Sequence, residues 1–161
     1  MNIGMMVRRR IREAARALLK HAHERFGSGS PNEWPVVFAV SNCYPTRIVL
    51  YAAAFQGGWN VQFMKSLREA LEASYSRMPK AVFYDHRAGD PVWHEYCSSF
   101  AREGVPFVFL GHKSDDETFM VVLASGGYQA WGDPLSSEEI VKAVDFAVEV
   151  AGPTRAPVLQ V

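Results

Sequence analysis

Short apolar runs alternate with longer segments of helical pattern over most of the chain. The apolar runs are Val36–Val40, Asn60–Met64, Ala81–Tyr84, Pro106–Leu110 and Tyr128–Trp131. The segments with helical pattern are Thr46–Gln56, Leu67–Ser74, Pro91–Glu103, Glu117–Ala124 and Ser137–Val150. The first, third and fourth runs lack polar alternation, which is typical of parallel strands covered on both faces. Strands alternating with helices predict right-handed βαβ units and an α/β fold with a doubly wound, five-stranded parallel sheet.

Apolar residues also recur at helical spacing near the N-terminus. This stripe, which we call the N-terminal stripe, consists of Ile11, Ala14, Ala15, Leu18, Leu19, Ala22 and Phe26. It predicts an amphipathic helix, which either dimerises or binds a partner, or folds back onto its own domain. Gly, Ser and Pro residues follow, and Gly152 and Pro153 end the last helical pattern. The predicted division is a basic amphipathic helix (1–27), a linker (28–35), a main domain (36–150) and a flexible tail (151–161).

Composition describes an ordinary globular protein with an uneven charge. The 161 residues are 48% hydrophobic and 21% charged, with no net charge. Residues 1–27 hold seven basic and two acidic residues, so this arm carries +5 and the remainder carries −5. No run approaches the ~18 apolar residues of a membrane span, and no secretory signal begins the chain. The two cysteines, Cys43 and Cys97, fit neither a metal spacing nor a disulfide framework, so a cytoplasmic protein is expected.

Polar residues follow the predicted strands at their carboxyl ends, where open α/β sheets place their functional crevice. They are Ser41, Asn42, Cys43, Asp85, His86, Gly111, His112 and Asp133. Two histidines and two aspartates among them leave a metal site open, although loop histidines are the simpler interpretation. Cys43 precedes a predicted helix, whose dipole lowers the pKa of a thiol.

The third run, Ala81–Tyr84, leads into Asp85, and the chain closes with a glycine-rich turn, a short strand, Asp133-Pro134 and a capped helix. This arrangement resembles the receiver domain of two-component response regulators, the CheY-like family, over residues 36–150. The resemblance implies the strand order 2-1-3-4-5. It also implies that Asp85 is the equivalent of the phosphoacceptor aspartate.

The other functional positions of that family are altered here. The acidic pair that binds metal is replaced by Ser41 and Asn42, the hydroxyl residue after the fourth strand by Gly111, and the lysine before proline by Asp133. Reversing one charge about 4 Å from a phosphorylated aspartate changes the interaction by several kcal/mol at an effective dielectric of ~20. The sequence therefore predicts a degenerate receiver, or pseudo-receiver. It predicts no cofactor, with Mg²⁺ binding only if the site is active.

We expect a signalling module that acts through protein–protein contacts and is not an enzyme. The interface candidates are Tyr128, Ala130, Trp131, Ile11, Leu18 and Leu19. A homodimer is expected, the protein partner is unknown, and neither direct nucleic-acid binding nor a membrane span is predicted. The alternative is a small-molecule sensor whose altered crevice, at Ser41, Asn42, Gly111 and Asp133, holds an uncharged or cationic ligand. An enzyme that uses Asp85, His86 or Cys43 is the third and weakest interpretation.

Overall fold

The computed structural model describes residues 33–111, 116–131 and 135–154, together with Arg9, Arg10, Glu13 and Arg16. For Trp131 and residues 148–154 it describes the backbone alone. The strands are β1 (Val36–Val40), β2 (Asn60–Phe63), β3 (Val82–Asp85), β4 (Phe107–Gly111) and β5 (Tyr128–Trp131). The helices are α2 (Tyr44–Gly57), α3 (Leu67–Ser76), α4 (Trp93–Arg102), α5 (Asp116–Ala124) and α6 (Ser137–Thr154), and a short 3-10 helix, η2, spans His86–Ala88.

The five strands form one parallel sheet with the order β2-β1-β3-β4-β5. The predicted fold class and strand order are therefore confirmed. The strand order leaves β2 and β5 at the two edges. Because all strands are parallel, their carboxyl ends lie along one edge of the sheet, which carries Asp85 and the residues that follow β1 and β4.

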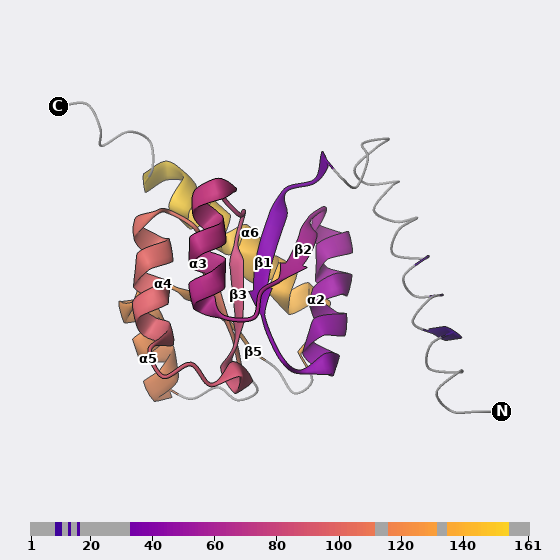
Figure 1. Cartoon of the computed structure of the whole chain (residues 1–161), viewed down its shortest axis with the longest axis horizontal. Coiled ribbons are helices and arrows are strands. Elements are labelled where there is room, and N and C mark those ends of the chain that lie inside the picture. The colour runs from indigo at the N-terminus through magenta and orange to yellow at the C-terminus, as the bar shows by residue number, and fades with distance from the viewer. Residues whose placement is uncertain are drawn as a thin grey trace.

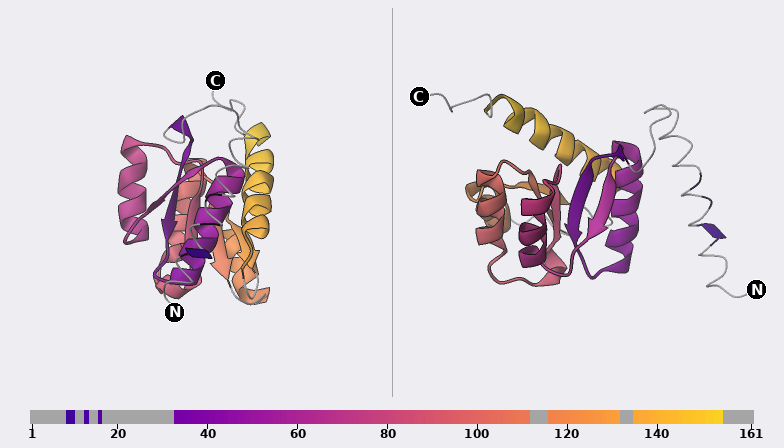
Figure 2. Two further views of the ribbon diagram at one scale, coloured as in Figure 1. Left: turned by 90° about the vertical axis from the view of Figure 1, so that its right-hand side faces the viewer. Right: turned by 45° about the horizontal axis from the view of Figure 1, so that its top comes forward.

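Helices cover both faces of the sheet (Figure 1, Figure 2). An apolar layer lies between the helices and the sheet on each face. On one face α3, α4 and α5 bury Leu67, Phe100 and Val122 against alternate residues of the sheet. On the other face α2 and α6 bury Leu50 and Ile140. The residues of β1, β3 and β4 are buried along their whole length, which explains why their sequences do not alternate.

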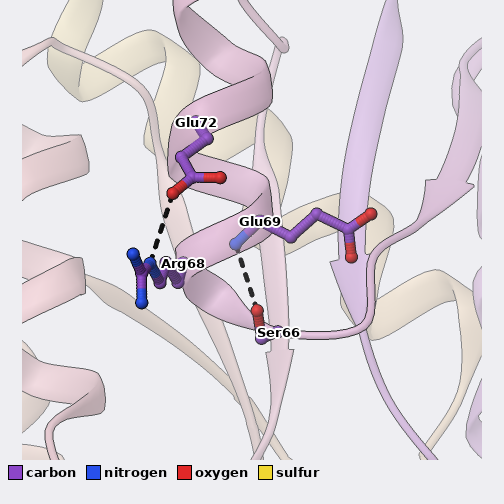
Figure 3. Close-up of polar contacts among 4 residues, drawn as sticks. All are labelled: Ser66, Arg68, Glu69 and Glu72. Atoms are coloured by element: carbon purple, nitrogen blue, oxygen red, sulfur yellow. Dashed lines mark hydrogen bonds and ion pairs between the residues drawn. The ribbon is translucent and has the colours of Figure 1, made fainter.

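Local hydrogen bonds fix where the helices begin and end. The side chain of Ser66 accepts a hydrogen bond from the amide of Glu69 at 3.1 Å, and an ion pair of 3.2 Å joins Arg68 to Glu72 one turn on (Figure 3). Ser136 likewise accepts from the amide of Glu139 at 3.2 Å, so it caps α6 as the sequence predicted. Helix α2 ends at Gly57 and is capped by Gly58, whose φ of 72° favours glycine.

Helix α6 is longer than its sequence pattern predicted. It continues through Gly152 and Pro153 to Thr154, whereas the pattern placed its end at residue 150. Proline has no backbone N–H and removes one hydrogen-bond donor from this last turn, and the helix ends at the next residue. The first residues of the predicted tail, 151–154, are thus helical, and residues 155–161 lie outside the described part of the chain.

Of the predicted N-terminal helix, the structure describes only Arg9, Arg10, Glu13 and Arg16. All four are helical and exposed, and Arg9 pairs with Glu13 at 2.9 Å. Every residue of the N-terminal stripe, including the interface candidates Ile11, Leu18 and Leu19, lies outside the described residues. Among the helices described, none has the length and apolar character needed to cross a membrane.

Candidate functional site

The sheet register brings Ser41 and Asp85 together. Val40 of β1 is paired with Tyr84 of β3, so the next residue on each strand emerges at the same edge of the sheet. Both side chains are buried, with 1% of each residue exposed. The hydroxyl of Ser41 donates a hydrogen bond of 2.7 Å to Oδ2 of Asp85. Two of the predicted site residues therefore form a direct, buried contact.

The other carboxylate oxygen of Asp85 is also engaged. Oδ1 accepts a hydrogen bond of 3.0 Å from the backbone amide of Arg87, the middle residue of η2, and so caps this short helix. Aspartate commonly closes a turn in this way, by accepting from the amide two residues on. Both oxygens of this buried carboxyl group are thus hydrogen-bonded to neutral donors, as buried polar groups generally are.

The same residues continue into a second cluster around Cys43. The Oγ of Ser41 accepts a hydrogen bond of 3.2 Å from the amide of Cys43. The guanidinium of Arg87 donates from Nη1 to the sulfur of Cys43 at 2.8 Å. Ser41, Cys43, Asp85 and Arg87 therefore form a connected group, which we call the Ser41–Arg87 cluster.

The surroundings of Cys43 favour its thiolate. The pKa of Cys43 is lowered, chiefly by hydrogen bonds from the hydroxyl and then the backbone amide of Thr46, while the charge of Arg87 acts in the same direction and burial opposes them. Cys43 also occupies the N-cap position of α2, at the positive end of the helix dipole. In contrast, burial raises the pKa of Cys97 to about 12.

We expect Cys43 to be alkylated selectively. At pH 8, iodoacetamide should modify Cys43 rapidly and leave Cys97 intact, because the thiolate is the reacting species and Cys97 is both protonated and buried. The midpoint of the pH–rate profile for Cys43 should lie below that of a free cysteine. Peptide mass spectrometry after timed quenching measures both rates in one sample.

The matched control is Thr46→Val, which removes the hydroxyl and keeps the shape of the side chain. Since that hydroxyl is the largest cause of the lowered pKa, the midpoint for Cys43 should move to higher pH while the rate for Cys97 stays the same. Equal alkylation rates at the two cysteines of the native protein would contradict the assignment.

Two further side chains form hydrogen bonds near this edge of the sheet. Arg47 of α2 donates from Nε to the carbonyl of Ser41 at 2.8 Å, and its guanidinium lies 4.7 Å from the ring centre of Phe63. The hydroxyl of Tyr84 accepts from the amide of Asp90 at 2.8 Å, which ties the loop after η2 to β3. Burial raises the pKa of Tyr84, so the phenol remains neutral at this contact.

The structure places the remaining predicted site residues in different surroundings. Asn42 is exposed beside the cluster, and Gly111 is a buried residue at the end of β4. His86 is exposed, and its ring lies 5.8 Å from that of Phe109. Asp133 and His112 lie outside the described residues, so the proposed crevice is described only in part.

The donor set around Asp85 does not fit Mg²⁺. This ion takes near-octahedral oxygen ligands, usually including one or two carboxylates. Here one carboxylate is described, it is buried, and both of its oxygens already accept hydrogen bonds. Among the described residues, no three His, Cys, Asp or Glu side chains form a group that could hold a metal.

Arg87 belongs to the Ser41–Arg87 cluster and Thr46 hydrogen-bonds to its Cys43, although the sequence singled out neither residue. Arg87 lies in η2, directly after β3, and from there its guanidinium reaches the sulfur of Cys43. The position of Arg87 two residues after a strand-end aspartate is a turn signal that could have placed its amide near Asp85. No comparable signal in the sequence joins its side chain to Cys43.

The three interface candidates of β5 differ in exposure. Ala130 is 3% exposed and belongs to the core, where it packs with residues of α6, so it offers no surface. Tyr128 is half-buried and makes an edge contact with Phe146 of α6, with ring centres 6.0 Å apart. For Trp131 the structure describes the backbone and not the side chain.

A larger apolar surface lies beside β5. Helix α5 buries only Val122 among its nine residues. Phe119, Met120, Val121 and Leu123 are between 39% and 62% exposed, and Phe146 of α6 is 59% exposed. Both helices contact the edge strand β5, α5 from one face of the sheet and α6 from the other, so these five side chains belong to the two helices that flank this edge. We call them the α5–α6 face.

Comparison with known proteins gives structural relatives alone, since neither a protein-family model nor a curated protein sequence matches the chain. The chemotaxis response regulator CheY4 of Vibrio cholerae is 19% identical over 71% of this chain and 98% of its own, with a TM-score of 0.57. A putative response regulator from Chloroflexus aurantiacus is 18% identical over 73% and 99%, with a TM-score of 0.60. The signal receiver domain of an HD domain-containing protein from Pseudomonas fluorescens is 15% identical over 82% and 99%, with a TM-score of 0.62. The resemblance seen in the sequence is thus confirmed at the level of the fold: the described residues between 36 and 154 have the flavodoxin-like fold of CheY and response-regulator receiver domains.

Proposed function

We propose that this protein is a receiver-like signalling module of the cytoplasm that acts through protein–protein contacts and without conventional aspartyl phosphorylation. The observation that carries the proposal is the state of Asp85. Its carboxylate is 1% exposed, and its two oxygens accept from the hydroxyl of Ser41 and the amide of Arg87. A phosphoacceptor must instead present a carboxylate oxygen to the phosphoryl donor.

The chemistry of the neighbouring positions supports the same proposal. Phosphoryl transfer depends on metal ions and cationic groups that neutralise the charge of the transferred group. The sequence supplies Ser41 and Asn42 at the positions of the acidic pair and Asp133 at the position of the lysine. With a donor set that does not fit Mg²⁺, the module works without a cofactor and without catalysis.

The α5–α6 face supports the proposed role in protein–protein contact. A helix that is apolar around most of its circumference is normally covered on all sides. Helix α5 exposes Phe119, Met120 and Leu123 instead, and apolar patches on a surface mark interaction sites. We therefore assign the expected homodimer contact to this face, with a second copy of the chain as the partner.

The test is exposure of the full chain to acetyl phosphate and Mg²⁺, followed by intact-mass measurement. We expect no phosphoryl adduct, because the nucleophilic oxygens of Asp85 are buried and engaged. Beryllofluoride with Mg²⁺ should likewise leave the melting temperature unchanged. A phosphorylatable receiver domain in the same mixtures shows that the reagents work.

Asp85→Asn is the matched variant, since it keeps the size of the side chain and removes the acceptor. A stoichiometric adduct on the native chain that disappears in Asp85→Asn would refute the proposal. It would mean that a donor can displace Ser41 from the carboxylate.

A further inference from the structure

The side of α2 that faces away from the sheet is apolar. Leu50 and Ala53 are buried against the core, and apolar residues recur at helical spacing on the opposite side of the helix. These are Tyr44, Ile48, Tyr51, Ala52 and Phe55, which we call the outer stripe of α2. Tyr44 and Tyr51 are 65% and 49% exposed, and the other three are half-buried. The 14 residues of α2 include one charged side chain, Arg47, and a helix that is apolar on both sides is normally covered on both.

The chain enters the domain beside the C-terminal end of α2. The backbone amide of Asn60, which follows shortly after α2 ends at Gly57, donates a hydrogen bond of 2.8 Å to the carbonyl of Pro35. The side-chain amide of Asn60 donates to the carbonyl of Trp34 at 3.4 Å. The segment that precedes Trp34 is therefore tethered next to the Phe55 end of the outer stripe.

The described residues of the N-terminal segment lie on the same side of the molecule. Drawn in indigo, they lie beyond α2, at the edge of the sheet that β2 forms (Figure 1, Figure 2). These residues, Arg9, Arg10, Glu13 and Arg16, are all charged and exposed. In a helical pattern they fall opposite the N-terminal stripe, so a helix with this charged side in solvent has its apolar side free to pack.

We propose that the N-terminal stripe packs on the outer stripe of α2 in the same chain. The two stripes agree in chemistry and in length, since residues 11–26 span about 22 Å and residues 44–55 about 17 Å at ~1.5 Å per residue. Both stripes contain alanine, which allows two helices to approach closely. This inference goes beyond the proposed function, because the outer stripe lies at the β2 edge of the sheet and its cover leaves the α5–α6 face free.

The linker favours one direction and one partner. Residues 27–33 form a flexible Gly/Ser-rich tether with a root-mean-square span of about 15 Å, at ~5–6 Å times the square root of their number. This tether reaches the near end of the outer stripe most easily, so we expect Phe26 to lie level with Phe55. Leu18 and Leu19 then lie level with Ile48. A segment tethered so closely acts at an effective concentration in the millimolar range, which favours it over a second copy in dilute solution.

Disulfide trapping in the full chain tests this contact. Leu18→Cys and Leu19→Cys are each combined with Ile48→Cys, in a Cys43→Ser background that removes the native thiol with the lowered pKa. The native Cys97 stays reduced because it is buried. Mild oxidation should close an intrachain disulfide in at least one of the two pairs, since this bond needs Cα atoms within ~7 Å of each other. Non-reducing gels and peptide mass spectrometry measure its rate.

Arg16→Cys combined with Ile48→Cys is the matched control. It places the cysteine on the exposed, charged side of the same segment and shares the change in α2. Its disulfide should form at least tenfold more slowly than that of the faster stripe pair.

The outcomes decide the occupant of the outer stripe. A fast intrachain disulfide whose rate is the same at every protein concentration supports the inference. Equal rates for the stripe pairs and the control overturn it, because the segment then moves without a preferred side. The absence of an intrachain disulfide in both stripe pairs also overturns it. Linked dimers that form more slowly on dilution overturn it as well and assign the outer stripe to a second copy. None of these results bears on the phosphoryl adduct that tests the proposed function.

Discussion

Asp85→Ala should lower the free energy of unfolding by about 2–4 kcal/mol, because it leaves the buried hydroxyl of Ser41 without its acceptor and removes the carboxylate that holds the amide of Arg87. Urea unfolding followed by circular dichroism measures the loss, provided that the slope with denaturant is unchanged. The sign of this change in stability distinguishes two descriptions of the site. Where several acidic groups crowd a site, removing one relieves repulsion and stabilises the fold. Here Asp85 is paired with neutral donors, so its removal is expected to destabilise.

Two further variants test whether the loss of stability comes from the hydrogen bond between Ser41 and Asp85. Ser41→Ala should cost about 1–3 kcal/mol, since it leaves Oδ2 of Asp85 buried without its donor. The double variant with Asp85→Ala should cost less than the sum of the two single variants, because both remove the same hydrogen bond. Strict additivity, or a gain in stability for Asp85→Ala, would contradict the neutral-donor account of this site.

Trp59→Ala should lower the free energy of unfolding by about 3–5 kcal/mol, because it opens a large cavity between α2 and the sheet. Trp59 is 2% exposed, and its ring lies 6.0 Å from that of Phe83 in the core layer under α2 and α6. Its indole nitrogen has no hydrogen-bond partner among the described residues. Trp59→Phe should therefore cost clearly less than Trp59→Ala, since it keeps much of the apolar volume and removes the unpaired N–H.

Gly57 provides a direct test of this packing. A Cβ at this position would lie 2.3 Å from the ring of Trp59, so Gly57→Ala should destabilise the native protein by about 1–3 kcal/mol through overpacking. In the Trp59→Ala background the same change should be neutral or stabilising, because the ring is absent and alanine favours the helix. Thermal and urea unfolding of the four proteins complete the cycle. Equal costs in both backgrounds would show that Gly57 and Trp59 do not contact each other as described.

The elements and the architecture could be predicted from the sequence because they depend on local patterns. Continuous apolar runs identified β1, β3 and β4, and the helical periods between them required parallel strands with crossovers. The cap of α6 by Ser136 was also a local signal. The end of α6 was predicted four residues too early, because Gly152 and Pro153 are residues that commonly end a helix and the chain continues through them.

The candidate site was predicted in part. The rule that strand ends meet at one edge of a parallel sheet placed Ser41 near Asp85, and the structure shows their hydrogen bond. The turn at η2 and the register of β1 with β3 determine which donors hold the carboxylate of Asp85. They also bring Arg87 to the sulfur of Cys43. These are contacts between residues far apart in the chain, and no short-range pattern specifies them.

The sequence by itself determined a doubly wound sheet and the presence of Ser41 and Asn42 directly after the first strand, because both are properties of residue types at given positions. Only the tertiary structure decided that the apolar residues of α5 face outward. Their pattern alone is that of a buried helix, yet α5 lies beside the edge strand β5, and a helix at an edge has neighbours on fewer sides. Exposure depends on what packs around an element, and the chain folds Val122 inward while Met120 and Leu123 remain uncovered.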